Sequence, residues 1–458
     1  MRKISLIPLE ALLVITYALF FIFLIQKFQF FETEGISKNT LSAIFILKLF
    51  FGFFVAAVYT YYYTDRSTAD VFKYFDASNV MFDTLKTNPV HFFKMLFGVD
   101  CDGAEFAWYY NKMDYWNSPG YSSIYNDSHL IIRINTVMRF FSFGYFNVHT
   151  VFFCFFSLIG LTAIYKTFIP VLQNKSKELM CVVFFVPSVL FWGSGVLKEG
   201  IVLFSLGLLM YNFNRLFNAK SFFICCVSAL MLGVLKFYVL AALVPGLLFM
   251  FWIHKTTSSK LLLKFITVVA VTAVLGLTIN TLTTNKNPLQ ILSQKQQDFN
   301  KLASGLQKGL NNKPIPKAGS AIKINKIEPT PLSFIKNSPQ ALVNSLLRPF
   351  IWESKSPIIV MAAVENVFVV AFIILCVAFA KPLKEIKWEF VLFGLSFSLI
   401  QLLFIGSSVP VVGAIMRYKI LAIPFLLIAF LLMLDKEKIS NKFSFSYKSR
   451  SSKLISEH

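Results

Sequence analysis

Long apolar segments separated by short polar connections fill most of the chain. A helix that crosses the roughly 30 Å core of a bilayer needs about 20 mainly apolar residues. Two pairs of neighbouring segments are shorter and closely joined, so their helices could be tilted, broken or re-entrant. The pattern predicts an all-α polytopic bundle of about ten or eleven spans, in a single transmembrane domain over 1–458. The predicted spans are 5–25, 41–63, 146–169, the two short pairs 179–195 with 199–213 and 220–235 with 237–253, and then 261–281, 358–380, 388–406 and 418–434.

Composition supports lipid as the solvent of these segments. Hydrophobic side chains make up 56% of the chain and charged ones 15%, whereas soluble domains average about 45–50% apolar and about 25% charged residues. The phenylalanine-rich runs 20–23 and 152–156 leave no polar face on a helix. A helix that is apolar all round is either deeply buried or faces lipid. Because many segments share this character, lipid contact is the better explanation.

The basic residues of the short connections predict the orientation. Lysine and arginine are enriched in cytoplasmic loops, which places the connectors near Lys175, Arg215, Lys255 and Lys381 and the tail 435–458 in the cytoplasm. Two long segments, 64–145 and 282–357, and the short connectors around Lys198 and Arg417 then fall on the outer side. The N-terminus also falls outside. Arg2 and Lys3 oppose that placement, and we expect the bias of the shorter loops to prevail.

The two long outer segments differ in kind. Segment 64–145 contains aromatic-rich stretches at 91–97 and 138–141, which are typical of helices that lie in the membrane interface. We expect it to be ordered. Segment 282–357 is basic and rich in Lys, Asn, Gln and Pro between 285 and 331, and we expect its middle to be mobile.

Several function classes are excluded or disfavoured. The net charge of +21 arises mainly from connections and the tail rather than from one basic face, so no nucleic-acid partner is expected. There is no Walker A pattern and no H-E-x-x-H motif, which argues against an ATPase and a metalloprotease. Ser194 and Lys198 are four residues apart and would share a helix face, so a serine nucleophile is a weaker option.

The first chemically informative cluster leaves the second span toward the outer side. It contains Asp65, Asp70 and Asp76 behind a run of tyrosines. Carboxylates at this position could act as a base on a sugar hydroxyl or hold a divalent cation against a phosphate. The alternative is that they are solvated and that the tyrosines only anchor the helix in the interface.

The second cluster is a break between two apolar segments, at 187–200. Trp192 precedes a Gly-Ser-Gly sequence, and Lys198 and Glu199 follow it. Two ionisable residues at membrane depth are costly unless they are paired or used. Lys198 could bind a lipid-linked phosphate with Glu199 as its partner; the alternative is an ordinary turn with a lysine that reaches the headgroups.

Two further clusters lie late in the chain. Arg348 begins a segment that re-enters the membrane and leads to Glu365 inside the next span, where a carboxylate usually faces a partner. Candidate partners of Glu365 are Arg348, Lys236 and Lys198, and a purely structural buried pair is the alternative. Arg417 and Tyr418 open the last span, and a guanidinium there suits a bidentate grip on phosphate or carboxylate.

Together these clusters resemble a family pattern. The pattern comprises an aspartate-bearing loop after an early span, an F-W-x-S-G-x-x-K-[DE] break, an R-P-[FY]-x-W-E re-entry followed by E-N, and a G-A-x-x-R-Y start of the final helix. It is similar to polytopic glycan-assembly proteins of bacterial inner membranes: oligosaccharide-repeat (O-antigen) polymerases and lipid-sugar-dependent glycosyltransferases of the GT-C type. GT-C enzymes usually carry the acidic motif after the first span, and here it follows the second, which favours the polymerase-like assignment.

The resemblance implies a function. The donor would be a polyprenyl-phosphate-linked glycan held by Lys198, Arg348 and Arg417, and an aspartate of the first cluster would serve the acceptor. Membrane lipid and a polyprenyl-linked glycan are thus the expected partners, and a divalent cation is the one cofactor left open. The alternative is a transporter or flippase for a lipid-linked or anionic substrate, with Lys236 and Glu365 as its membrane-embedded sites.

Overall fold

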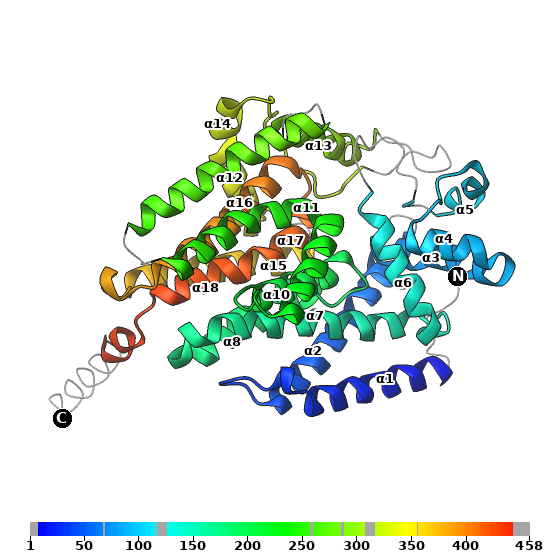
Figure 1. Ribbon diagram of the computed structural model, residues 1–458, viewed down its shortest axis with the longest axis horizontal. Coiled ribbons are helices and arrows are strands. Elements are labelled where there is room, and N and C mark those ends of the chain that lie inside the picture. The colour runs from blue at the N-terminus through cyan, green and yellow to red at the C-terminus, as the bar shows by residue number, and fades with distance from the viewer. Residues whose placement is uncertain are drawn as a thin grey trace.

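The structure is a computed structural model that describes residues 8–66, 69–113, 115–116, 126–256, 260–284, 288–306, 317–354 and 356–442. Most of its helices lie side by side in one bundle, and shorter helices gather beyond one end of that bundle (Figure 1). Within these residues there is no β-strand, and only isolated β-bridges occur. The predicted all-α bundle is confirmed.

Seven helices of the described chain are long and apolar enough to cross a membrane. The last two helices form an eighth candidate, which bends by 54°. The protein is therefore a multi-pass membrane protein. These helices are α1 (Pro8–Lys27), α2 (Lys38–Ala57), α7 (Phe146–Phe168), α11 (Ala219–Lys255), α12 (Leu261–Thr284), α15 (Pro357–Ala378), α16 (Trp388–Ser408) and the bent pair α17 (Val412–Tyr418) with α18 (Ile423–Met433).

The four predicted spans of the two short pairs correspond to short or divided elements. The span predicted at 179–195 is split into α8 (Ser176–Phe184) and α9 (Pro187–Trp192), because Pro187 starts a new helix and the small residues after Trp192 end it. The span predicted at 199–213 is α10 (Lys198–Phe213). The spans predicted at 220–235 and 237–253 are the two halves of α11, which meet at Lys236, where φ −152° and ψ 78° are not helical.

The two halves of α11 run in opposite directions. The first half packs antiparallel to α10 and the second half antiparallel to α16. Since α10 begins beside Arg417, which follows the end of α16, these two neighbours are themselves antiparallel. The contacts that define the pairings are Ser205 with Met231 and Leu209 with Cys225 for the first half, and Phe404 with Tyr238 and Phe393 with Gly246 for the second.

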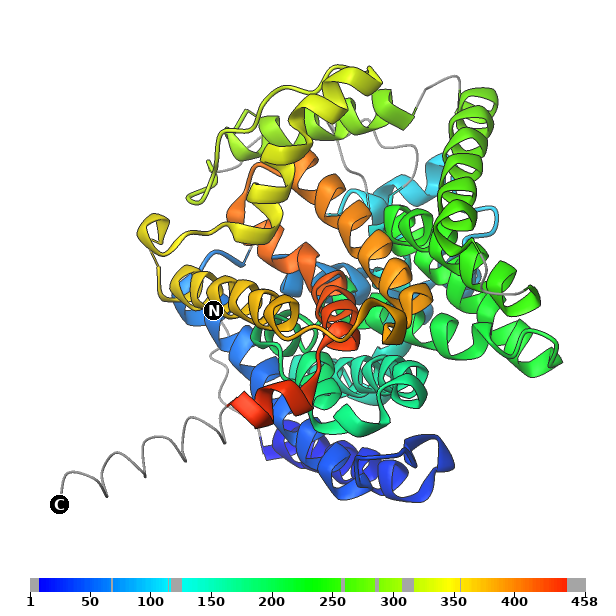
Figure 2. The same cartoon turned by 90° about the vertical axis from the view of Figure 1, so that its left-hand side faces the viewer.

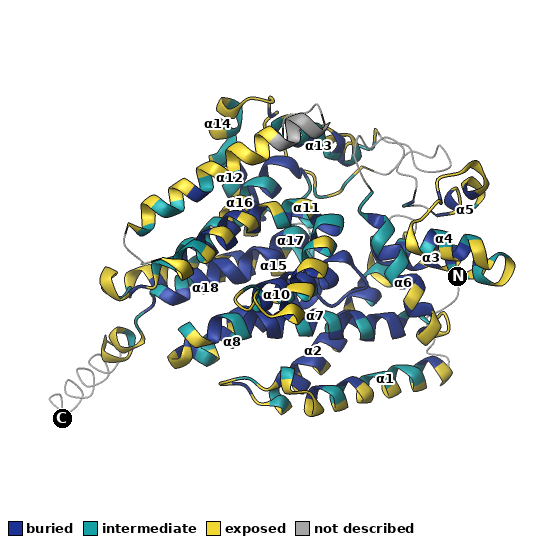
Figure 3. Ribbon diagram, in the orientation of Figure 1, coloured by how far each residue is buried: buried dark blue, intermediate teal, exposed yellow. Residues whose placement is uncertain are grey.

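Burial separates the centre of the bundle from its edge. The end-on view places α18 in the middle, with α1 and α12 at the periphery (Figure 2). Only 17% of the apolar window of α1 and 6% of that of α12 is buried (Figure 3). Outward apolar surface of this kind is what a helix presents to lipid. In contrast, α7 and α10 pack closely because Gly160 and Gly207 lie backbone against backbone.

Six short helices lie at or beside one end of the bundle, here named the loop end. The aromatic stretches predicted at 91–97 and 138–141 are helical and belong to α4 and α6. Arg139 of α6 fixes α6 to α3 by donating to Ser78 Oγ at 2.8 Å and to the Phe75 carbonyl at 2.6 Å. The mobile middle predicted for 282–357 falls partly at 307–316, outside the described residues. The loop-end helices are α3 (Asp70–Thr87), α4 (Pro89–Phe97), α5 (Ala107–Tyr110), α6 (Ser128–Ser142), α13 (Pro288–Ala303) and α14 (Pro331–Leu342).

The lysine-bearing connectors lie at the opposite end, here named the basic end. Lys175 donates to the Leu431 carbonyl at 2.8 Å, and Lys436 forms a 2.7 Å ion pair with Glu178. The long loops and the basic connectors are thus separated as the sequence pattern requires. That the basic end faces the cytoplasm stays a prediction. Arg2, Lys3 and the tail beyond residue 442 lie outside the described residues.

Candidate functional site

Arg417 is the centre of a buried ionic network at the loop end. Its guanidinium forms an ion pair with Asp70 through Nη1 and lies 2.9 Å from Glu199 Oε1 through Nε. The same Glu199 oxygen accepts a 2.8 Å hydrogen bond from Lys236 Nζ. One carboxylate therefore bridges two cations, and one guanidinium bridges two carboxylates. We name Asp70, Glu199, Lys236 and Arg417, with Lys198 and Asp127 introduced next, the ionic network.

Lys198 and Asp127 complete the network toward the surface. Lys198 Nζ lies 2.9 Å from Asp127 Oδ1 and donates to Ser128 Oγ at 3.2 Å. The Lys198 ammonium also lies 5.1 Å from the centre of the Tyr74 ring. With three carboxylates and three cations, the network is electrically balanced, which is the condition under which buried charges are tolerated.

Each member is positioned by the end or break of a helix. Asp70 opens α3, and Lys198 and Glu199 open α10 directly after the broken segment. Lys236 occupies the reversal within α11, and Arg417 is in the last turn of the short α17. A carboxylate in the first turn of a helix is also favoured by the helix dipole. Helix ends carry the charges here because apolar helix middles could not solvate them.

Exposure rises steadily from the inside of the network to the loop end. The side chain of Glu199 is 0% exposed and that of Lys236 5%, whereas that of Asp70 is 30% and that of Asp127 46% exposed. Asp70 and Asp127 are therefore the members that a ligand reaches first.

Asp70 is held in its charged form. Burial would raise the pKa of its carboxyl, but the Arg417 guanidinium and a hydrogen bond from the Tyr115 hydroxyl outweigh burial and hold the pKa below its ordinary value. Asp70 is thus a charged acceptor that is paired with Arg417 and accepts a hydrogen bond from Tyr115.

Within the described residues, three polar atoms in or beside the network are buried without a hydrogen-bond partner. They are Glu199 Oε2, the Tyr238 hydroxyl and Arg417 Nε, which faces Glu199 Oε1 as an ion pair. Tyr238 belongs to the second half of α11, and its ring stacks on Phe404 at 4.6 Å. Buried polar groups are normally satisfied, so such atoms mark places where a polar ligand can bind.

The sequence-predicted residues divide into two groups. Asp70, Lys198, Glu199, Arg417 and Tyr418 come together, and Tyr418 presents its ring 4.4 Å from the Lys236 ammonium. The other predicted residues lie outside the ionic network. Asp65 is exposed ahead of α3, Asp76 pairs with Arg66 on the surface, Trp192 is buried in α9 against Phe191, Arg348 pairs with Glu353, and Glu365 is buried in α15.

Glu365 and its neighbour make a second polar cluster between the same segments. Glu365 accepts from Ser188 N at 2.6 Å and from Ser188 Oγ at 2.7 Å. Asn366 accepts a hydrogen bond from Lys419 and donates to the Leu347 carbonyl at 3.0 Å. Contacts with 413–419 therefore link the other three charged segments picked out in the sequence, 61–76, 187–200 and 347–366, although not around a single set of side chains. None of the three partners predicted for Glu365 contacts it.

Sequence reasoning missed three participants. Asp127 and Tyr115 come from the loop between α5 and α6, and nothing in their local sequence distinguishes them from solvated loop residues. Lys48 is different, because it is a charged residue inside a predicted span. Its Nζ donates to the Gly193 carbonyl at 3.2 Å and to Ser194 Oγ at 3.1 Å. Ser194 is thus paired with Lys48, and the suggested Ser194–Lys198 pairing is not formed.

The carboxylates of the site face cations instead of one another. Among the residues that the structure describes, no group of three or more His, Cys, Asp or Glu side chains could hold a metal ion. Asp70, Glu199 and Asp127 each have a cationic partner within 4 Å. The geometry therefore suits anion binding by displacement of a carboxylate better than cation binding.

No protein-family model, curated protein or solved structure matches this chain. The fold and the site define its class: a multi-pass α-helical membrane protein with a charge-balanced ionic network buried between broken helices at one end of the bundle.

Proposed function

We propose that the chain is a membrane glycosyl-transfer protein, of polymerase-like type, that takes sugar from a polyprenyl-phosphate-linked donor at the loop end. The observation that carries the proposal is the position of Arg417, which bridges Asp70 and Glu199 just beneath the loop-end helices. A guanidinium is the side chain best suited to grip a phosphate. The setting is the inner membrane of a bacterial cell, with the loop end on its outer side and surface polysaccharide as the product.

The chemistry follows from an exchange of partners. The donor phosphate competes with Asp70 for Arg417 and with Asp127 for Lys198, because both carboxylates are the partly exposed members of their pairs. Asp70 then loses the guanidinium that lowered its pKa and becomes a stronger base. Glu199 and Lys236, which are nearly fully buried, keep the rest of the network in place.

Group transfer then balances without a nucleotide. The acceptor hydroxyl gives its proton to the Asp70 carboxylate while its oxygen bonds to the anomeric carbon of the donor sugar. The bond between that carbon and the phosphate oxygen breaks, and the polyprenyl phosphate leaves with the electron pair. Arg417 and Lys198 stabilise the charge that develops on the leaving oxygen, which is the electrostatic role that lowers such barriers most.

Two aspartates of the same helix provide the test. Asp70→Asn removes the proposed base, whereas Asp76→Asn alters a carboxylate that pairs with Arg66 on the surface. In cells that depend on the protein for surface polysaccharide, we expect Asp70→Asn and Arg417→Lys to abolish the polymer at normal protein level. We expect Asp76→Asn to leave it unchanged. Normal polymer in both network variants would refute the proposal.

A transporter or flippase is the second candidate, and one observation favours it. The chain reverses at Lys236 and breaks between α9 and α10, and such discontinuous helices often form transport sites near the middle of the bilayer. In that case Lys236→Met would block movement of a lipid-linked substrate across vesicle membranes, while Asp70→Asn would have no effect. The two proposals therefore predict opposite results for Asp70.

A further inference from the structure

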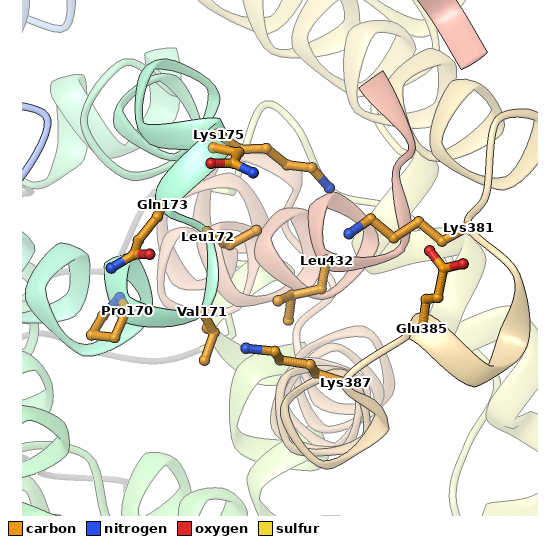
Figure 4. Close-up of a pocket in the computed structure, with 10 residues that line it drawn as sticks. Pro170, Val171, Leu172, Gln173, Lys175, Lys381, Glu385, Lys387 and Leu432 are labelled. Atoms are coloured by element: carbon orange, nitrogen blue, oxygen red, sulfur yellow. The ribbon is translucent and has the colours of Figure 1, made fainter. Parts of the chain in front are cut away.

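A cavity of about 230 Å³ lies at the basic end, far from the ionic network along the bundle. Its wall is formed by the connector after α7, by the connector between α15 and α16, and by Leu432 of α18. Figure 4 shows Lys175 and Lys381 with their amino groups directed toward one another, and Lys387 reaching in from a third side. Pockets for drug-sized ligands measure about 300–1,000 Å³, so this one suits a single small group.

The lining of the cavity carries three lysines and one glutamate, so its cations outnumber its carboxylates. In the described part of the chain, no Asp or Glu oxygen lies within ion-pair distance of Lys175, Lys381 or Lys387. Glu385 also lines the cavity. The nearby Glu178 is engaged elsewhere, by Lys436 at 2.7 Å. The ammonium groups of Lys175 and Lys381 face one another and repel, and a bound anion would relieve that repulsion.

Hydrogen bonds hold the lining in place without using up its donors. Lys175 Nζ donates to the carbonyls of Leu431 and Leu434, which leaves one of its three N–H groups free. The Lys381 backbone N–H donates to the Met433 carbonyl at 2.8 Å, and Trp388 Nε1 donates to the Leu383 carbonyl at 2.9 Å. The two lysine-bearing connectors are thus tied to α18 and to α16 before any ligand arrives.

The burial of Lys175 supports the same conclusion. Its side chain lies in the wall rather than at the rim, and burial, followed by the charge of Lys381, lowers the pKa of its ammonium from the ordinary value to about 8. A buried ammonium that faces a second cation across a cavity is costly, and a bound anion would offset that cost.

We propose that this cavity binds a phosphate group through Lys175, Lys381 and Lys387. The apolar part of the wall, Val171, Leu172 and Leu432, accommodates the carbon atoms next to that group. The phosphate is either the headgroup of an anionic lipid or a free phosphate from solution. This binding site is separate from the network proposed for glycosyl transfer.

The experiment uses the full chain in lipid nanodiscs and two probes. In the first arm, the phosphatidylglycerol retained by protein extracted from mixed phosphatidylglycerol and phosphatidylcholine nanodiscs is measured by native mass spectrometry. In the second arm, inorganic phosphate is titrated calorimetrically into protein in phosphatidylcholine nanodiscs. Specific binding in the first arm identifies a lipid headgroup, and binding in the second identifies a soluble phosphate.

Matched variants decide between a built site and general attraction to a basic surface. Lys381→Gln combined with Lys387→Gln removes two lining ammonium groups, and we expect at least about tenfold weaker binding of the probe that the wild-type protein binds. Lys384→Gln removes a lysine of the same connector that does not line the cavity, and it should bind as the wild type does. If the double variant unfolds, the single variant Lys387→Gln replaces it in the binding experiment, because it changes only an exposed side chain. Equal binding by wild type and lining variants, or no binding of either probe, would overturn the proposal.

Discussion

The two ends of the bundle differ in how their charged side chains are balanced. At the loop end, three carboxylates and three cations satisfy one another within the ionic network. At the basic end, three lysines meet around a cavity with no carboxylate in ion-pair distance in the described chain. A balanced network needs no bound ion, and an anionic ligand must displace one of its carboxylates to bind. An unbalanced cluster is relieved by any anion that fits, so the two ends are expected to respond differently to mutation, pH and salt.

The largest effect is expected where the balance of the loop end is broken from inside. Glu199→Gln leaves Lys236 and Arg417 buried with one carboxylate fewer, and removal of one partner from a buried ionic cluster costs about 3–5 kcal/mol of unfolding free energy. Thermal unfolding in detergent micelles measures the loss. Arg417 still has Asp70, so the folded state should be weakened rather than abolished.

A compensating variant tests whether charge balance is the cause. Glu199→Leu combined with Lys236→Leu removes one charge of each sign and leaves the Arg417–Asp70 pair. Apolar replacements of buried ion pairs are often neutral or stabilising, so we expect the double variant to unfold at a higher temperature than Glu199→Gln. If Glu199→Gln is as stable as the wild type, the ionic network contributes no net stability, and charge balance does not stabilise the loop end.

At the basic end the expected effect is smaller and depends on pH. Lys175 carries its charge below its pKa of about 8 and loses it as the pH rises above that value. The charged groups around it are Lys381, Glu178 and Asp435, and the thiol of Cys376 also faces it. Retention of the phosphate probe should fall several-fold between about pH 7 and pH 9, since one of three ammonium groups is lost. The bound anion opposes deprotonation, which places the midpoint above 8.

The pH arm has its own control. The double variant Lys381→Gln and Lys387→Gln keeps Lys175 but binds the phosphate probe weakly at every pH. Its retention of the probe should therefore be low and nearly independent of pH. A wild-type curve that is flat from pH 7 to 9 would show that Lys175 does not contribute its charge to binding.

The fold was predictable from the sequence wherever it depends on local apolar length. The seven predicted spans outside the two short pairs each match a long apolar helix or, for the last one, the bent pair α17 and α18, because a run of about 20 apolar residues has few alternatives to a helix in lipid. What could not be predicted is how the short elements pair. The reversal at Lys236 depends on α10 and α16, which flank the two halves of α11. Judged by length and apolar composition alone, α11 is one candidate span, although it consists of two antiparallel halves.

The candidate site was predictable where charge and membrane depth coincide. Lys198, Glu199 and Arg417 stand out because ionisable residues next to apolar helices need partners. Asp127 and Tyr115 could not be found, since their importance comes from contacts with Lys198 and Asp70 across long stretches of chain. Arg348 had the same sequence signal as Arg417 but pairs locally with Glu353. The roles assigned to these residues stay predictions.

The smallest effect is expected at a surface pair that repeats the chemistry of the network. Arg66 makes two hydrogen bonds to Asp76, at 2.9 and 2.6 Å, yet their side chains are 52% and 49% exposed. Exposed ion pairs contribute about 0–1 kcal/mol and are screened by salt. Arg66→Gln should therefore lower the unfolding free energy by no more than about 1 kcal/mol, and less at high ionic strength. Because α3 supplies both Asp70 and Asp76, the same helix carries a partly buried and an exposed Arg–Asp pair. A loss as large as that of Glu199→Gln would mean that burial does not distinguish the two pairs.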